Sequence, residues 1–111
     1  MLRIMVLVTT LALSQFALSN EAHNLLSGKS AEDQAFFLGY AARSAGMDCP
    51  NGSARKPFFQ GFDSAQSAYW NITCGNEAYT VMLENDALGS SSAMPCSVLK
   101  AIGIVCYTKF D

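Results

Sequence analysis

The chain is poor in the side chains on which most cofactor sites depend. It has one histidine, His23, and charged residues make up only 14% of its 111 residues, against roughly 25% in an average globular domain. One histidine is too few for a multi-histidine metal site, and the sequence contains neither a Gly-rich phosphate loop nor a Cys-x-x-Cys-His haem attachment site. A net charge of −2 lacks the basic surplus that nucleic-acid binding needs. We therefore expect no metal, no other cofactor and no nucleic-acid partner.

Groups that could carry out catalysis are equally scarce. An enzyme needs a nucleophile with a base, a pair of acids or a metal ion. The position of His23 near the N-terminus disfavours a Ser-His-Asp arrangement. The candidate paired carboxylates fall in expected turns or at expected strand ends, where solvated acids are ordinary: Asp63, Glu77, Glu84 and Asp86. The sequence therefore favours a protein that is not an enzyme.

Residues 1–19, MLRIMVLVTTLALSQFALS, have the layout of a secretory signal peptide. Arg3 supplies a positive start, an apolar run follows, and Ala17 and Ser19 are small residues at the −3 and −1 positions of a cleavage site before Asn20. The run is shorter than the roughly 20 apolar residues that span a bilayer. We expect cleavage after Ser19, or alternatively after Ala22, and a periplasmic or secreted protein with no stable membrane span.

All four cysteines lie in the part of the chain that remains after cleavage. An even number in a short exported chain predicts disulfides, and the absence of any Cys-x-x-Cys disfavours zinc and thioredoxin-like chemistry. Of the three possible pairings we favour Cys49–Cys74 with Cys96–Cys106, because both links are then local. The alternative, Cys49–Cys106 with Cys74–Cys96, would tie the first helix to the last strand.

Hydrophobic periodicity predicts a helix over residues 31–45, after a loose leader over residues 20–29. Ser30 is a suitable N-cap with acids in the first turn, and Gly46 is a natural stop. The small residue Gly39 would let this helix approach a sheet closely. An apolar stripe follows at steps of three and four residues, with two aromatic residues widening one flank: Ala31, Ala35, Leu38, Ala42 and Ala45, flanked by Phe36 and Tyr40.

The strongest local signal is a β-hairpin of residues 68–74 and 77–84 around Gly75-Asn76. A two-residue loop makes the numbers of paired positions sum to 151. This register places six apolar residues on one face, as Ala68 with Leu83, Trp70 with Val81 and Ile72 with Tyr79. The pattern predicts that this face receives the helix.

The rest of the chain completes an α+β domain. Residues 57–62 predict a first strand, in which Gly61 marks a bulge or a close backbone approach. A polar loop is expected over residues 85–93, a short helix over 94–103 and a final strand over 104–110. We therefore predict one domain over residues 30–111, with the N-terminal helix on one face of a disulfide-linked antiparallel sheet of about four strands.

A candidate partner-binding patch lies on the other face of the hairpin. The register places Tyr69 beside Met82 and Asn71 beside Thr80, and Tyr107 on the last strand could extend the patch. Tyrosine and methionine are enriched in the cores of protein interfaces. The sequence therefore predicts that Tyr69, Asn71, Met82 and Tyr107 contact another protein.

The segment YWNITCGNEAYTVML, residues 69–83, has a Trp-x-x-x-Cys-Gly pattern followed by Tyr-x-Val. In this it resembles small periplasmic proteins, including lysozyme inhibitors, whose strands carry cysteines. The Ser-Gly-x-x-Tyr loop of the inhibitors is absent, and residues 89–92, Gly-Ser-Ser-Ser, lack its aromatic residue. The resemblance therefore does not by itself carry that function over.

Three functions are compatible with an exported, disulfide-linked domain that lacks catalytic groups. The first is a protein-binding accessory subunit or assembly factor of a periplasmic or extracellular complex. The second is an inhibitor of an exported hydrolase, which would insert the loop over residues 85–93 into an active-site cleft. The third is a carrier that holds a small ligand in the groove between helix and sheet.

Overall fold

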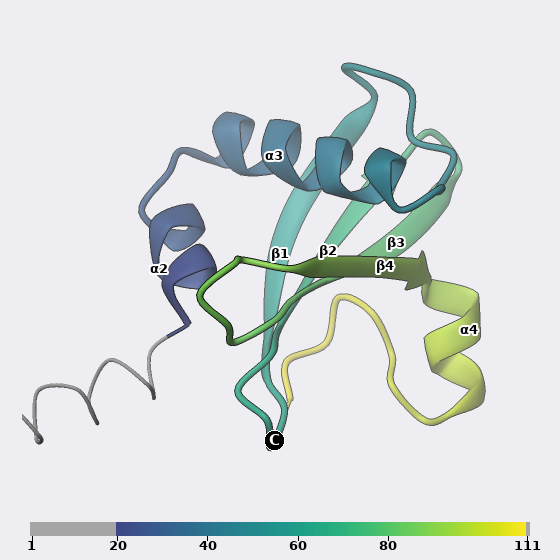
Figure 1. The fold of residues 1–111 in the computed structure, drawn as a ribbon. Coiled ribbons are helices and arrows are strands. Elements are labelled where there is room, and N and C mark those ends of the chain that lie inside the picture. Colours follow the sequence, from purple (N-terminus) through teal and green to yellow (C-terminus); the bar gives the residue numbers. More distant parts are fainter. Residues whose placement is uncertain (1–19, 111) are drawn as a thin grey trace, which may run out of the picture.

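The computed structural model describes residues 20–110 of the chain, so the predicted signal peptide lies outside the described residues (Figure 1). In chain order the elements are α2 (Glu21–Ser27), α3 (Ala31–Ser44), β1 (Ala54–Phe62), β2 (Ala68–Cys74), β3 (Glu77–Leu83), β4 (Ser91–Pro95) and α4 (Cys96–Ala101).

The four strands form one antiparallel sheet in the order β1-β2-β3-β4, and α3 crosses one of its faces (Figure 1). Helix α2 precedes α3 at the same side, and α4 continues from β4 at the far edge. The predicted α+β class, with the N-terminal helix on a four-stranded antiparallel sheet, is confirmed. Within residues 20–110 no helix has the length and hydropathy needed to cross a bilayer.

The hairpin register is confirmed at every position. Ala68 pairs with Leu83, Trp70 with Val81 and Ile72 with Tyr79, so each pair of numbers sums to 151. Trp70 is 4% exposed and the other inward residues of the hairpin are also buried. The apolar alternation fixes the register because a slip of one residue would turn all these side chains to the opposite face.

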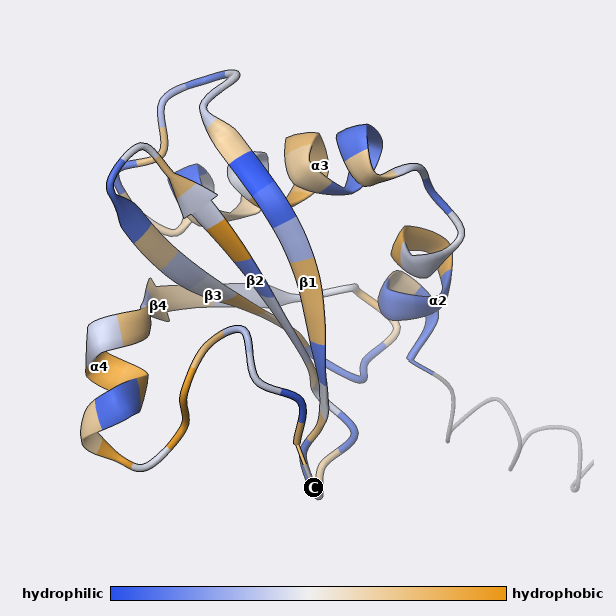
Figure 2. Ribbon diagram, turned by 180° about the vertical axis from the view of Figure 1, so that it is seen from behind, coloured by the Kyte–Doolittle hydropathy of each residue, from blue (hydrophilic) through white to orange (hydrophobic). Residues whose placement is uncertain are grey.

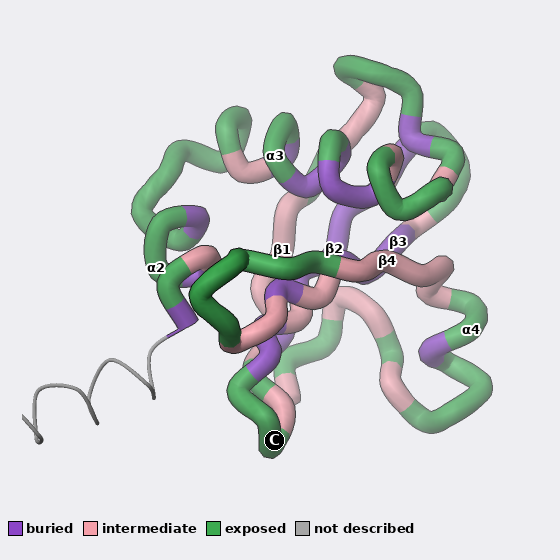
Figure 3. The backbone as a smooth tube through the Cα atoms, in the orientation of Figure 1, coloured by how far each residue is buried: buried purple, intermediate pink, exposed green. Residues whose placement is uncertain are grey.

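Helix α3 begins and lies as its sequence predicts. The Ser30 hydroxyl accepts a hydrogen bond from the Asp33 amide at 3.2 Å, which caps the first turn. A Cβ built at Gly39 would lie 2.9 Å from the Ala54 Cβ, so the absence of a side chain allows α3 and β1 to approach. Figure 3 shows buried and exposed positions alternating along this helix. The buried side is formed by Ala35, Leu38, Gly39, Ala41 and Ala42.

The expectation that Phe36 and Tyr40 widen the buried stripe is wrong. Phe36 is 65% exposed and Tyr40 58% exposed. The stripe is narrow because small residues such as Ala42 bring the helix backbone close to the sheet, so the aromatic residues on the outer side are left in solvent.

Strand β1 is longer than predicted and irregular. It begins at Ala54 rather than at Pro57, and its register against β2 shifts between Arg55 and Phe58 and again between Phe59 and Gly61. Gly61 has a φ of +148°, and a Cβ built there would lie 2.9 to 3.1 Å from atoms of Phe110. Both predictions for Gly61, a bulge and a close approach, therefore apply.

Two further assignments from sequence need correction near the chain ends. The predicted loose leader contains α2, whose N-cap Asn20 accepts a hydrogen bond from the His23 amide at 3.1 Å. At the other end the predicted helix over 94–103 begins only at Cys96, since Met94 and Pro95 belong to β4. The predicted loop over 85–93 is correspondingly shorter, because β4 begins at Ser91.

The predicted final strand, residues 104–110, is not a strand. Tyr107 has a φ of +61°, which breaks an extended run. The backbone groups of this segment instead meet side-chain amides, as described below.

The favoured disulfide pairing, Cys49–Cys74 with Cys96–Cys106, is present. The first bridge is buried, with Cys49 2% and Cys74 4% exposed, and it joins the start of the 49–53 turn to the end of β2. The second bridge is half-buried and joins α4 to the C-terminal segment. Together they fix the chain on both sides of the sheet.

Candidate functional site

The face of the sheet away from α3 is covered in part by the C-terminal segment, which we define as residues 103–110. Figure 2 shows this segment running back beneath the sheet after α4. The buried side chain of Gln60 donates hydrogen bonds to the carbonyl oxygens of Val105 at 2.8 Å and Thr108 at 3.0 Å. The Phe110 amide in turn donates to the Gln60 carbonyl at 2.9 Å. Gln60 thus makes the hydrogen bonds with the backbone of this segment that a neighbouring β-strand would otherwise make.

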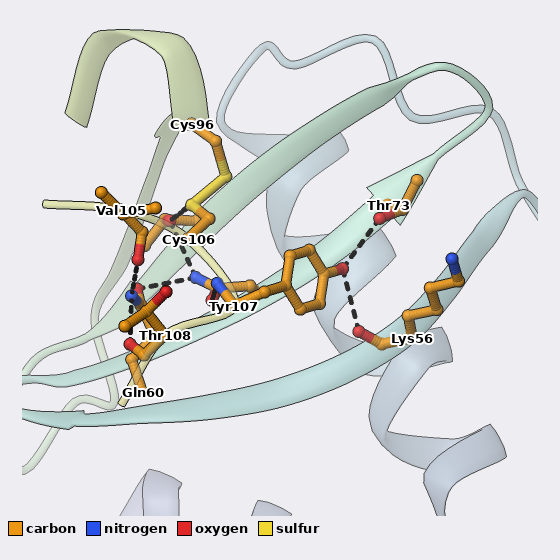
Figure 4. Close-up of a disulfide and its surroundings, with 10 residues drawn as sticks. Lys56, Gln60, Thr73, Cys96, Val105, Cys106, Tyr107 and Thr108 are labelled. Atoms are coloured by element: carbon orange, nitrogen blue, oxygen red, sulfur yellow. Dashed lines mark hydrogen bonds between the residues drawn. A yellow bond between two sulfur atoms is a disulfide. The ribbon is translucent and has the colours of Figure 1, made fainter. Parts of the chain in front are cut away.

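Asn71 and Tyr107 complete this attachment, and Figure 4 shows the Tyr107 side chain reaching Thr73 and Lys56. Asn71 is fully buried, accepts a hydrogen bond from the Tyr107 amide at 2.7 Å and donates to Gln60 and Thr80. The Tyr107 hydroxyl donates to the Lys56 carbonyl at 3.0 Å and lies 2.8 Å from the Thr73 hydroxyl. Burial raises the pKa of the Tyr107 hydroxyl above its usual range. Among the described residues, no buried side-chain nitrogen or oxygen lacks a hydrogen-bond partner.

The structure brings the predicted partner-binding residues onto one face of the sheet, but several of them contact other residues of the same chain. Tyr69 packs against Phe110 with ring centroids 5.2 Å apart, and its hydroxyl donates to Asp63 at 3.2 Å. Burial, followed by the charge of Asp63, raises the pKa of Tyr69. Met82 pairs with Tyr69 as predicted and is half-buried. Asn71 and Tyr107 hold the C-terminal segment, so Asn71 is open to no partner while that segment is in place. Whether Tyr69, Met82 and Tyr107 contact a partner stays a prediction.

The sequence contains two Asn-x-Ser/Thr glycosylation sequons, at Asn51 and at Asn71, and the two differ in burial. Asn51 is exposed in a turn, whereas Asn71 is fully enclosed and its amide nitrogen is engaged in two hydrogen bonds.

A surface that the sequence did not single out lies on the outer side of α2 and α3. We call it the aromatic face, and define it as Leu25, Phe36, Phe37 and Tyr40. These side chains are 71%, 65%, 42% and 58% exposed, respectively. Large apolar side chains that gather in the open often mark interaction sites, whereas scattered ones are ordinary. One signal in the sequence could have revealed the face: Phe36 and Tyr40 lie on the side of the helix opposite Leu38 and Ala42.

The surface of the aromatic face is uneven. Phe36 forms a ridge between two hollows, because it lines both of them. One hollow, of about 580 Å³, lies between α3 and the start of β1 and includes Gly39, Pro50 and Arg55 in its wall. This is the groove between helix and sheet that the carrier hypothesis requires. The other hollow, of about 510 Å³, lies between α2 and α3 and is walled by Leu25, Phe37 and Gly89.

Helix α2 is held against the sheet by an aromatic cluster around His23. The Trp70 indole nitrogen donates to His23 Nδ1 at 3.1 Å, and the rings of Phe59 and Phe62 lie 4.4 and 4.8 Å from the imidazole centroid. Since an indole can only donate, the imidazole must accept at Nδ1 and is neutral. Burial, and then the charge of Lys109, hold the pKa of His23 below its usual value of 6.5.

The same cluster corrects one expectation from the sequence. His23 does not lie in a loose leader, since it is 8% exposed. Phe59 packs against Trp70 with centroids 5.3 Å apart, because the register shift in β1 turns it inward. His23 therefore has a structural role in attaching α2.

The loop between β3 and β4 presents one large apolar side chain. The Asp86 carboxylate accepts hydrogen bonds from the backbone amides of Leu88 at 3.1 Å and Ser90 at 3.0 Å. The bond from Ser90 is the main reason why the pKa of Asp86 lies below its usual range. Leu88, at the tip, is 90% exposed. The backbone of this loop is thus hydrogen-bonded to the loop's own acid.

Within residues 20–110 no group of three or more His, Cys, Asp or Glu side chains is arranged to hold a metal ion, and the described cysteines are all in disulfides. The surface does carry exposed apolar side chains beside two hollows.

The fold and this surface define a disulfide-linked α+β domain with a helical aromatic face. Comparison with protein-family models, with curated proteins and with solved structures finds no match for this chain.

Proposed function

We propose that this protein is a small exported binding domain whose partner, another protein, docks on the aromatic face. The observation that carries the proposal is the exposure of Leu25, Phe36, Phe37 and Tyr40 on two adjacent helices. Aromatic residues are enriched at the centres of interfaces. The two hollows beside Phe36 would accept side chains of the partner.

Export is part of the same proposal. Two disulfides in a domain of this size are typical of an oxidising compartment. The layout of residues 1–19 supports secretion or a periplasmic location. An accessory subunit or assembly factor in that compartment needs a stable scaffold and an apolar docking face, and no reactive group.

The test compares three variants of the tagged, mature protein as baits in its native host. Leu25→Ser with Phe36→Ser removes the two most exposed members of the aromatic face and should abolish recovery of the partner. Val98→Ser with Ile102→Ser is the matched control, because these residues are 51% and 71% exposed on and after α4. Tyr69→Ser with Met82→Ser tests the patch predicted from sequence.

Thermal melts must first show that each variant folds. Partner recovery that survives the loss of Leu25 and Phe36 would refute the proposed site. Loss with the Tyr69 and Met82 variant alone would transfer the site to the other face of the sheet.

A second candidate function is inhibition of an exported hydrolase by the β3–β4 loop. It is favoured by Leu88, which the ordered Asp86 loop presents at 90% exposure. Inhibitors of this kind place a rigid loop in an active-site cleft. In an assay with a lysozyme as the probe enzyme, Leu88→Ser should remove inhibition and the Leu25 and Phe36 variant should keep it. Absence of inhibition by the wild-type protein would set this candidate aside for that enzyme class.

A further inference from the structure

A seam of side chains with a definite order runs along the outer side of α3. Asp33, Phe36, Tyr40 and Arg43 follow one another at steps of three, four and three residues. At 3.6 residues per turn these positions share one side of the helix. That side is opposite Leu38 and Ala42, which are fully buried. A spacing of three and four residues is the one by which two helices pack along each other.

The order of chemistry along this seam is symmetric. An acid stands at the N-terminal end, two aromatic residues in the middle and a base at the C-terminal end. Consider two identical α3 helices that pack antiparallel, related by a two-fold axis that crosses them level with residue 38. The numbers of the residues that face each other then sum to 76. Asp33 then faces Arg43 of the other copy, and Phe36 faces Tyr40 of the other copy.

We infer that the aromatic face docks a second copy of this chain, with the two α3 helices antiparallel. The inference rests on the part of the proposed function that makes the aromatic face a docking surface, and it assigns a second copy of the chain to that surface. A two-fold interface requires a surface that is complementary to itself, and the seam meets this condition in charge and in aromatic content. A parallel pair would instead place acid against acid and base against base, which is unfavourable.

The shape of the surface also suits a second copy of the chain. Phe36 stands as a ridge between hollows of about 580 and 510 Å³. In a two-fold pair the ridge of each copy enters a hollow of the other, which is how packed helices fill the space between them.

Arg43 is positioned for this role. Its guanidinium donates to the Cys49 carbonyl at 2.9 Å and lies 5.8 Å from the centre of the Tyr40 ring. These contacts hold the cation beside the seam and leave other N–H groups for a carboxylate. Asp33 is exposed, and its backbone amide alone serves the helix cap.

The test is a charge-reversal cycle, followed by sedimentation velocity of the full mature chain. The interface is small, so concentrations from about 1 μM to about 1 mM are needed. The wild type should show a monomer–dimer equilibrium. Asp33→Arg and Arg43→Glu should each weaken it about tenfold or more, because the symmetry turns two attractions into two repulsions. The double variant should restore dimerisation.

Control measurements make each outcome decisive. Val98→Ser with Ile102→Ser should leave the dimer intact, and circular dichroism should show every variant folded. If Arg43→Glu fails to fold because it loses the hydrogen bond to Cys49, Asp33→Arg alone still tests the effect of charge reversal on dimerisation. As a second measurement, p-benzoylphenylalanine at position 36 should cross-link to the peptide containing Tyr40 of the second copy.

A wild type that is monomeric at every concentration, or a dimer unaffected by charge reversal, would overturn the second-copy inference. The proposed function would survive that result if Leu25→Ser with Phe36→Ser still abolished recovery of a different protein from the host. It would fail separately if that variant kept all binding.

Discussion

At the scale of single residues, two glycines allow α3 and the C-terminal segment to pack closely on the two faces of the sheet, and neither glycine can be replaced without a steric clash. Gly39 allows α3 to approach Ala54, and Gly61 allows the Phe110 ring to lie on β1. Gly61 is the more demanding position, because its φ of +148° is also one that L-residues rarely adopt. Steric fit and backbone conformation therefore both require glycine there.

Gly61→Ala should lower the free energy of unfolding by about 1 to 3 kcal/mol, since the new Cβ would lie within 3.1 Å of Phe110 in a strained backbone conformation. Urea denaturation measures the change. Gly28→Ala is the control, because Gly28 has an ordinary φ of −83° and its added Cβ would meet nothing closer than 3.7 Å. Equal stability of the two variants would contradict this account of Gly61.

At the scale of elements, the attachment of α2 to the sheet includes a hydrogen bond that protonation of His23 would break. His23 accepts from Trp70 in its neutral form, and its pKa is lowered by burial and then by Lys109. In the unfolded chain the imidazole takes up a proton as the pH falls through about 6.5. The folded state resists that proton, so it binds fewer protons than the unfolded state and loses stability in this range.

The melting temperature should therefore fall as the pH is lowered from about 7 through about 6.5, and level off once His23 is protonated in the folded protein as well. His23→Gln keeps an oxygen acceptor for Trp70 but cannot titrate, so its melting temperature should be flat over the same interval. The chain has no other histidine. An identical slope in both proteins would assign the pH dependence to other groups.

The elements show which parts of the fold the sequence encodes locally. The β2–β3 hairpin could be predicted residue by residue, because alternation over seven positions on each side admits one register. Helix α3 could be predicted from its cap and period. Helix α2 was missed because seven residues hold too little periodicity, although Asn20 followed by Glu21 is a signal for a helix start.

The C-terminal segment shows what the sequence does not encode locally. Its apolar and aromatic residues suggested a strand, yet its backbone bonds to Gln60 and Asn71, which are 45 and 36 residues away from Val105 and Tyr107. No short-range pattern announces such a bond. For the same reason the patch expected at Asn71 could not be recognised as covered, and the exposed side of α3 emerged only from the three-dimensional packing.

At the scale of the whole molecule, stability depends on two covalent links around a modest core. The core cluster joins α2, α3 and the inner face of the sheet through Leu26, Leu38, Trp70, Ile72 and Leu83. Helix α4 and the C-terminal segment lie on the opposite side and are tied down by Cys96–Cys106. A domain of this size buries only a limited apolar surface on either face of the sheet, so the disulfides matter for its stability.

Reduction of both bridges should lower the melting temperature by at least about 10 °C, since each bridge contributes roughly 2–4 kcal/mol and a domain of this size loses several degrees per kcal/mol. Calorimetry with and without a phosphine reductant measures the shift. With limiting reductant, alkylation should label Cys96 and Cys106 before Cys49 and Cys74, because the latter pair is buried. Equal melting of both forms would show that the bridges are dispensable.

The broken register of β1 has a consequence for how this protein behaves among its neighbours. A sheet with a straight, unpaired border invites further chains to add themselves, which is the first step of fibrous aggregation. Here Lys56, with a φ of +56°, Pro57 and the bulge at Gly61 interrupt that border on β1, and on the opposite border β4 is only five residues long and ends at Pro95. Growth by strand addition is therefore discouraged at both borders of the sheet.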